Sequence, residues 1–338
     1  MPRDSYRNFI TYKIDPLSEI RNVGITTSGS VFFVKATGDA DYITVEDAVG
    51  ADAMRNTVQG GIDRVRSDAN DYVLVCPQDA NAAYALGTSI DVNEDRVHLI
   101  SLGYTKAAQG YSNTFRGYVI ADGADTSLMD VTGAGCELAG FRLLGTNGTI
   151  SAGLLRIGTA STGTAHQTWV HDVVVESNAA AAGNGTSDLV TFQGDVGVGI
   201  VGCRFDDCWI GNWSWAPAAA VRMTGTAGPA RTEFHNTTFV VDAQATTDSI
   251  VTIGTGQTEY TIFENCRFLN VEAGTAPASA ITGAVLVDNP VLLRNCSYLN
   301  VTQGGTDTEV YKSPASSGTQ AAVFDYGISI GTAVISPA

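Results

Sequence analysis

The sequence predicts an all-β fold, a right-handed parallel β-helix with a single helix capping its N-terminal end. Three observations predict it. A pattern of strand-forming residues recurs about every thirty residues, each repeat carries at least two short apolar runs, and no helical stretch separates the runs. A repeat of that length built from short strands is typical of a solenoid of stacked coils, and not of a β-sandwich.

The repeat is clearest in the C-terminal half. Four segments align: VGIVGCRFDDC from Val198, ARTEFHNTTFV from Ala230, EYTIFENCRFL from Glu259 and PVLLRNCSYLN from Pro290. Their equivalent aromatic positions are expected to be Phe205, Phe239, Phe268 and Tyr298, at separations of 34, 29 and 30 residues, and Leu143 and Val175 extend the series towards the N-terminus. Since parallel neighbours lie about 4.8 Å apart, we expect these residues to stack directly above one another.

Second apolar runs give each coil at least two strands. They begin at Leu154, Leu189, Ala220, Ile250 and Ala284. Small and polar residues predict loops at one phase of the coil, at 178–187, 211–217, 243–249, 272–279 and 303–318. Insertions in a solenoid gather on one face, which is often the contact face. About nine coils are predicted from Val73 to the C-terminus.

The N-terminal region is expected to differ from the coils. Residues 1–30 lack periodicity and predict an extended polar arm, and the β-helix domain is expected to span 31–338. The runs VFFV (31–34) and YITV (42–45) predict a hairpin. Val58, Ile62 and Val65 lie at helical spacing and predict a capping helix at about 55–66, followed by coils at about 73–330. A helix at this place would cover the open end of the core.

Polar and sulfur ladders are expected inside the stack. Asn236, Asn265 and Asn295 recur at one phase and predict a buried ladder at a coil corner, and Cys266 is expected to lie over Cys296. The six cysteines lack any CxxC or Cys/His metal spacing, so we expect reduced thiols in the core, no disulfide framework, no metal site and no cofactor.

Composition excludes some partners. The chain carries 35 acidic and 19 basic residues, a formal net charge of -16, and no basic cluster, which disfavours nucleic acid and anionic lipid. No apolar run approaches the roughly 18 residues of a membrane span. The first residues, MPRDSYRNFITYKIDP, lack the apolar core of a secretory signal. The expected origin is therefore a cytoplasm, without export by the usual route.

The segments TVQGGID from Thr57, VLVCP from Val73 and VHLISLG from Val97 occur in the order of a known entry pattern, a helix followed by two strands. The sequence thereby resembles the pectate-lyase-type right-handed β-helix superfamily in its phage-associated branch, over residues 57 to 330. Gln78 replaces the glycine that follows the proline in that pattern. The resemblance implies a homo-trimer, and the scaffold hosts lyases, hydrolases and inert virion parts.

Candidate catalytic residues are few. Sugar hydrolysis needs two carboxyl groups about 5 to 10 Å apart. Asp206 and Asp207 follow a predicted strand, and Asp172 lies one coil earlier beside His171, so these three aspartates are weak candidates for a catalytic set. Two adjacent aspartates at a strand end also form ordinary solvated turns. The histidines otherwise look scattered, and none accompanies a nucleophile motif.

Three tryptophans cluster in CWIGNWSWAP on the predicted insertion face. Trp209, Trp213 and Trp215 are candidate binding residues, because exposed indoles stack on sugar rings or anchor protein interfaces. They could equally fold back over the core and hold the loop in place.

Three functions are consistent with these features. The favoured one is a non-enzymatic structural protein of a tailed-phage virion, either a capsid decoration (cement) protein or a short fibre or spike, that binds other virion subunits. The second is a receptor-binding tailspike that cleaves a host-surface glycan as a glycoside hydrolase or polysaccharide lyase. The third is a cellular carbohydrate-active enzyme or adhesin, which the missing export signal disfavours.

Overall fold

The computed structural model describes seventeen stretches of the chain. They are residues 29–77, 84–85, 89–102, 119–121, 127–145, 153–158, 165–177, 188–194, 199–212, 219–225, 229–242, 249–253, 260–271, 279–283, 291–299, 311–312 and 323–325. Most of the predicted N-terminal arm, the strand predicted from Ala284 and almost all of the predicted insertion loops lie outside these residues.

The described strands form three parallel sheets. Sheet A runs in the order β2 (Met54–Arg55), β1 (Val31–Val34), β3 (Tyr72–Val75), β6 (His98–Ser101), β9 (Glu137–Ala139), β12 (Trp169–His171), β15 (Arg204–Asp206), β18 (Thr232–His235), β21 (Thr261–Glu264), β24 (Val291–Arg294) and β27 (Val323–Asp325). Sheet B runs β4 (Tyr84–Ala85), β7 (Val119–Ala121), β10 (Arg142–Gly145), β13 (Val174–Ser177), β16 (Trp209–Gly211), β19 (Thr238–Val241), β22 (Arg267–Asn270) and β25 (Ser297–Leu299). Sheet C runs β5 (Ile90–Val92), β8 (Met129–Val131), β11 (Leu155–Ile157), β14 (Val190–Gly194), β17 (Val221–Gly225), β20 (Ser249–Ile253), β23 (Ser279–Gly283) and β26 (Tyr311–Lys312).

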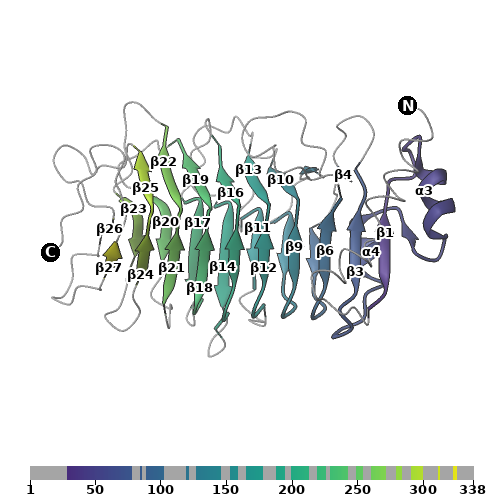
Figure 1. Cartoon of the computed structure of the whole chain (residues 1–338), viewed down its shortest axis with the longest axis horizontal. Coiled ribbons are helices and arrows are strands. Elements are labelled where there is room, and N and C mark those ends of the chain that lie inside the picture. The colour runs from purple at the N-terminus through teal and green to yellow at the C-terminus, as the bar shows by residue number, and fades with distance from the viewer. Residues whose placement is uncertain are drawn as a thin grey trace.

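Each coil contributes one strand to each sheet, in the order C, A, B. Strands of one sheet therefore lie side by side along the long axis of the molecule (Figure 1). Sheet A has nine strands from β3 to β27, as predicted from the repeat. The chain is a right-handed parallel β-helix, and the predicted fold class is confirmed.

The predicted stacking of aromatic residues is correct except at one position. Phe239, Phe268 and Tyr298 pair directly across β19, β22 and β25 of sheet B. Their neighbour in β16 is Ile210, whereas Phe205 lies in sheet A and pairs with Phe234. The alignment was misled because the segment from Cys203 to Ile210 contains two short strands, and its aromatic residue lies on the first.

The corner between sheets A and B explains the recurring asparagines. Asp172, Asp207, Asn236, Asn265 and Asn295 all have φ between 51° and 56°, the left-handed region. Asparagine and aspartate tolerate this conformation better than most residues with a side chain. At the corners from Asp172 to Asn265 the backbone N–H donates to a carbonyl of the next coil, as Asn236 does to Glu264 at 2.9 Å. The three asparagines are exposed, so the prediction that this ladder is buried was wrong.

Aromatic columns fill the core. In sheet A, the ring of Phe234 stacks on those of Phe205 and Phe263, with centroids 5.0 Å apart in both pairs. In sheet B, Phe268 stacks on Phe239 at 5.1 Å and on Tyr298 at 5.4 Å. Parallel in-register strands place equivalent side chains one strand spacing apart, which suits offset stacking of identical rings.

The N-terminal hairpin prediction was wrong. Strand β1 pairs in parallel with β2 and β3, while the YITV run lies in helix α3 (Tyr42–Val49). Val45 of α3 packs with Phe33, Met54 and Leu74 in a second apolar cluster on the outer side of sheet A. A helix satisfies its own backbone, and one apolar stripe is enough to cover these outward residues.

The helix predicted from Val58, Ile62 and Val65 is present but shorter than expected. Helix α4 spans Val58–Ile62, Thr57 caps it by accepting a hydrogen bond from Gly60 N at 3.0 Å, and the three apolar side chains are buried in the main core. Strands β1 and β2 extend sheet A beyond β3 at this end. A role of α4 as the end cap stays a prediction.

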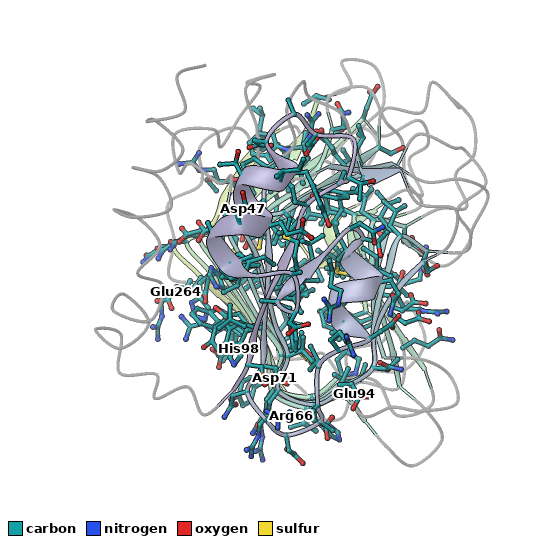
Figure 2. All side chains as sticks on the ribbon, turned by 90° about the vertical axis from the view of Figure 1, so that its right-hand side faces the viewer. Asp47, Arg66, Asp71, Glu94, His98 and Glu264 are labelled. Atoms are coloured by element: carbon teal, nitrogen blue, oxygen red, sulfur yellow. The ribbon has the colours of Figure 1, made fainter. Side chains whose placement is uncertain are left out.

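The buried carboxylate of Asp71 ties the start of β1 to the segment that follows α4. It accepts hydrogen bonds from the backbone N–H groups of Ser30 at 2.5 Å and Arg66 at 2.9 Å. Asp71 and Arg66 lie at one corner when the solenoid is viewed along its axis (Figure 2).

All six cysteines are buried thiols, as predicted. Burial raises the pKa of Cys136 to about 11 and that of Cys203 to about 12. Cys266 and Cys296 occupy equivalent positions in adjacent coils. Among the described residues, no helix has the length and apolar character needed to cross a membrane.

Candidate functional site

The outer face of sheet A carries two rows of mostly polar side chains. One row of cross-strand neighbours is His98, Glu137, Trp169, Arg204 and Glu233; the other is Ile100, Ala139, His171, Asp206, His235, Glu264 and Arg294. We call the polar and aromatic members of these rows, from β6 to β24, the polar face. Figure 2 shows His98 and Glu264 on the same side of the solenoid.

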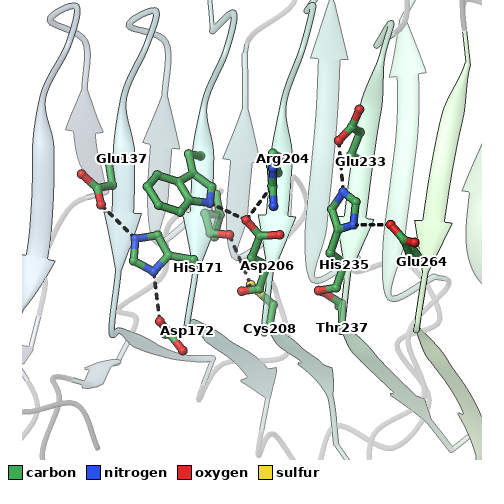
Figure 3. A network of polar contacts seen from close by, with 12 residues as sticks. Glu137, His171, Asp172, Arg204, Asp206, Cys208, Glu233, His235, Thr237 and Glu264 are labelled. Atoms are coloured by element: carbon green, nitrogen blue, oxygen red, sulfur yellow. Dashed lines mark hydrogen bonds and ion pairs between the residues drawn. The ribbon is translucent and has the colours of Figure 1, made fainter. Parts of the chain in front are cut away.

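Glu137 joins two histidines on neighbouring coils. Its Oε2 lies 2.5 Å from His98 Nδ1. Its Oε1 lies 2.9 Å from His171 Nε2 (Figure 3). The other ring nitrogen of His171 lies 3.0 Å from Asp172 Oδ2. On the neighbouring strand β3, the ring of Tyr72 stacks on that of His98, with ring centroids 4.3 Å apart.

These contacts fix the charge states of the cluster. Burial raises the pKa of Glu137, but hydrogen bonds with His171 and His98 outweigh it and lower the pKa to about 2. Burial lowers the pKa of His171, but hydrogen bonds with Asp172 and Glu137 outweigh it and raise the pKa to about 9. At neutral pH an imidazolium therefore lies between two carboxylates.

At the centre of the polar face, the indole of Trp169 is hydrogen-bonded to the carboxylate of Asp206. Trp169 Nε1 donates to Asp206 Oδ2 at 2.6 Å, and Arg204 Nε donates to the same oxygen at 2.7 Å. The indole also packs against the ring of His171, with centroids 4.2 Å apart. Asp206 is only 9% exposed, whereas Trp169 is 40% exposed.

A third histidine, His235, lies between two glutamates further along the polar face. His235 Nε2 lies 3.0 Å from Glu233 Oε2, and its Nδ1 lies 3.2 Å from Glu264 Oε2 (Figure 3). The hydrogen bond from Arg294 to Glu264, at 3.1 Å, lowers the pKa of Glu264. Basic and acidic side chains thus alternate from coil to coil across His235, Glu264 and Arg294.

The structure places the candidate aspartates in different settings. Asp206 and Asp172 both reach the polar face, since Asp172 binds His171, which is the cross-strand neighbour of Asp206. Asp207 occupies the left-handed corner, where its backbone N–H donates to the carbonyl of His235 at 3.0 Å. The Asp-Asp pair is therefore an outward strand end followed by a corner residue.

Trp209 is the single member of the predicted tryptophan cluster within the described residues; Trp213 and Trp215 lie outside them. Trp209 belongs to β16 of sheet B and is half-buried, and its Nε1 donates to the carbonyl of Gly211 at 3.0 Å. Trp209 therefore lies on sheet B, whereas the polar face lies on sheet A.

Sequence reasoning missed most of this site. His98 and His235 were treated as scattered, and Glu137, Trp169 and Arg204 were not considered. The signal was available in the register, because residues about 30 to 39 positions apart become neighbours once the coils are stacked. In the described part of the chain, no group of three or more His, Cys, Asp and Glu side chains is arranged to hold a metal ion.

Solved structures resemble this fold at low identity. Pectin methylesterase PemA from Erwinia chrysanthemi is 12% identical, with a TM-score of 0.45, over 91% of this chain and 92% of that chain. Pectate lyase Pel9A is 11% identical, with a TM-score of 0.41, over 91% and 83%. ORF18 of Geobacillus virus E2 is 11% identical, with a TM-score of 0.40, over 94% and 65%.

No protein-family model matches the sequence, and no curated protein matches it. The likenesses to solved structures concern the fold alone. In its fold, this chain is a right-handed parallel β-helix, as the repeat predicted.

Proposed function

We propose that this chain is a non-enzymatic structural protein of a tailed-phage virion, a capsid decoration (cement) protein or a short fibre or spike, that binds other virion subunits. One observation carries the proposal: the candidate catalytic aspartates are engaged in structural contacts, within a coil or between neighbouring coils. Asp206 accepts hydrogen bonds from Trp169 and Arg204, Asp172 binds His171, and Asp207 forms a corner.

A hydrolase needs one carboxylic acid with a raised pKa and a second carboxylate facing the same bond. The polar face has the opposite character at Glu137, whose pKa is lowered to about 2 by its histidine partners. A carboxylate that stays ionised in an ion pair between coils has no proton to donate, but it does help to hold the coils rigidly together. A stiff, acidic rod suits a component of a particle surface exposed to solvent.

The proposal includes three further parts. The chain assembles as a homo-trimer, the trimer is located in the virion, and its partners are other capsid or tail proteins. The formal net charge of -16 supports protein partners over nucleic acid or membranes. The corresponding test is to locate the protein on purified particles by cryo-electron microscopy with a gold-labelled antibody. Labelling of the capsid surface supports a decoration protein and labelling of the tail supports a fibre or spike. Particles that carry no label would refute the virion role.

A receptor-binding tailspike that cleaves polysaccharide is the second candidate. One feature favours it: the imidazolium of His171 lies beside the exposed indole of Trp169, and a protonated side chain next to an aromatic ring of sugar size can act as a general acid. The test is depolymerisation of host-surface polysaccharide by the purified protein, with His171→Gln and the pair Asp206→Asn with Asp207→Asn. Cleavage that these variants abolish would establish the tailspike and overturn the non-enzymatic proposal.

A further inference from the structure

Trp169 is unusual among the large apolar residues of the described chain because it is exposed yet rigidly held. Its indole is 40% exposed, while most aromatic side chains of the core are buried. The hydrogen bond from Nε1 to Asp206 and the contact with His171 fix two sides of the ring. An aromatic side chain that is already immobile loses little conformational entropy when it binds a ligand.

The groups around this ring supply hydrogen-bond donors and acceptors together. Glu137 and Arg204 are the direct cross-strand neighbours of Trp169, one on each side. Arg204 is half exposed, and its guanidinium has five N–H donors, of which Nε binds Asp206. Glu233, next to Arg204 in the same row, adds a carboxylate whose side chain is 30% exposed.

A rigid, exposed indole bordered by both hydrogen-bond donors and acceptors matches one kind of ligand. The C–H face of a pyranose ring stacks on an indole, and its hydroxyl groups both donate and accept hydrogen bonds. A peptide anchor would need an apolar pocket, whereas the members of both rows adjacent to Trp169 are polar except Ala139. The net charge of -16 opposes a sulfated or uronic-acid polymer and favours an uncharged sugar.

We propose that Trp169, with Arg204 and Glu233, forms a binding subsite for a neutral saccharide on the outer face of sheet A. The indole stacks on one sugar ring, the guanidinium donates to its hydroxyl oxygens and the carboxylate accepts from its hydroxyl groups. The subsite binds without cleaving. It goes beyond the structural role proposed above and stands whether the protein lies on the capsid, on the tail or on neither.

The experiment is binding of the whole chain to an array of immobilised neutral and anionic glycans, followed by calorimetric titration with the soluble form of each glycan that binds. We compare the wild type with Trp169→Ala and Trp169→Phe. Trp209→Phe is the matched control, because Trp209 lies in sheet B with its Nε1 bonded to a carbonyl. Circular dichroism and thermal melting confirm that each variant folds.

We expect binding to neutral glycans, an affinity about tenfold lower in Trp169→Ala, a smaller loss in Trp169→Phe and no change in Trp209→Phe. Arg204→Gln should also weaken binding. Three results would overturn the proposal: no neutral glycan binds, anionic glycans alone bind, or Trp169→Ala binds as well as the wild type. None of them bears on whether the protein is found on particles.

Discussion

The two faces of sheet A share one register but follow opposite rules. On the inner face, equivalent residues repeat: Phe205, Phe234 and Phe263 stack ring on ring. On the outer face, basic and acidic residue types alternate from strand to strand, as in the row His171, Asp206, His235, Glu264 and Arg294. The difference shows that, in an in-register parallel stack, each side chain contacts the equivalent side chain of the next coil, so a favourable or unfavourable contact between identical residues is repeated along the sheet. Aromatic rings attract one another at this spacing and like charges repel.

The inner face should dominate stability. We expect Phe234→Ala to lower the free energy of unfolding by about 3–5 kcal/mol, because it removes the middle ring of the column and leaves a cavity that rigid coils cannot close. Urea denaturation followed by circular dichroism measures it. Phe234→Leu, which keeps most of the volume, should lose clearly less. Equal losses in the two variants would mean that the cavity is not the cause.

The outer face should contribute less per residue, and through specific pairs. Glu137→Gln should lower the free energy of unfolding by about 2 kcal/mol, because it removes the carboxylate that lies between two half-buried histidines and leaves His171 with Asp172. Proton NMR should show the pKa of His171 moving from about 9 towards its ordinary value. The control is Glu176→Gln, which breaks the pair of Glu176 with Arg142 on sheet B and should cost under about 1 kcal/mol.

The pH dependence of stability should separate the faces below about pH 8, where the core thiols keep their protons in the folded and the unfolded chain. His171 binds its proton more tightly in the folded chain, so its contribution is complete below its unfolded pKa of about 6.5 and is lost as pH rises through about 9. Glu137 behaves in the opposite sense, and its contribution is lost as pH falls from about 4.3 through about 2. Melting temperatures should therefore fall on the alkaline side, and His171→Gln should flatten that fall. An unchanged alkaline limb in His171→Gln would assign it to another group.

The smallest effect is expected at the corner between sheets A and B. Asn265→Ala should cost about 1 kcal/mol, because alanine is strained at φ 56°, whereas Asn265→Gly should be close to neutral. Thermal denaturation of the two variants measures the difference. If alanine and glycine behaved alike, the asparagine would be acting through its side chain and not through its backbone conformation.

The sequence predicted the stack because identity between coils is visible in one dimension. Phe239, Phe268 and Tyr298 recur at nearly constant spacing and pair as predicted. Phe205 was assigned to the wrong sheet because an aromatic residue near the right spacing outweighed the corner. Asp207, whose φ matches those of the asparagines, marks the correct phase and aligns Ile210 instead.

The polar face was harder to predict because its members differ from coil to coil. His171 and Glu137 have no common pattern, and they become partners only through the pairing of β9 with β12. Similarly, YITV has the composition of a strand, but the outward side chains Phe33, Met54 and Leu74 needed a cover, which α3 provides. Tertiary context decided both cases.

The left-handed corners also set how the length of this molecule can vary. From Gly140 to Asn265, the N–H of each left-handed corner donates to the carbonyl that precedes the corner of the next coil, so these neighbouring coils share one kind of backbone connection. Excising one complete coil, or inserting a copy, brings together edges that are already compatible. Such proteins can gain or lose whole coils, while the surface side chains of each coil can be substituted independently of those of the other coils.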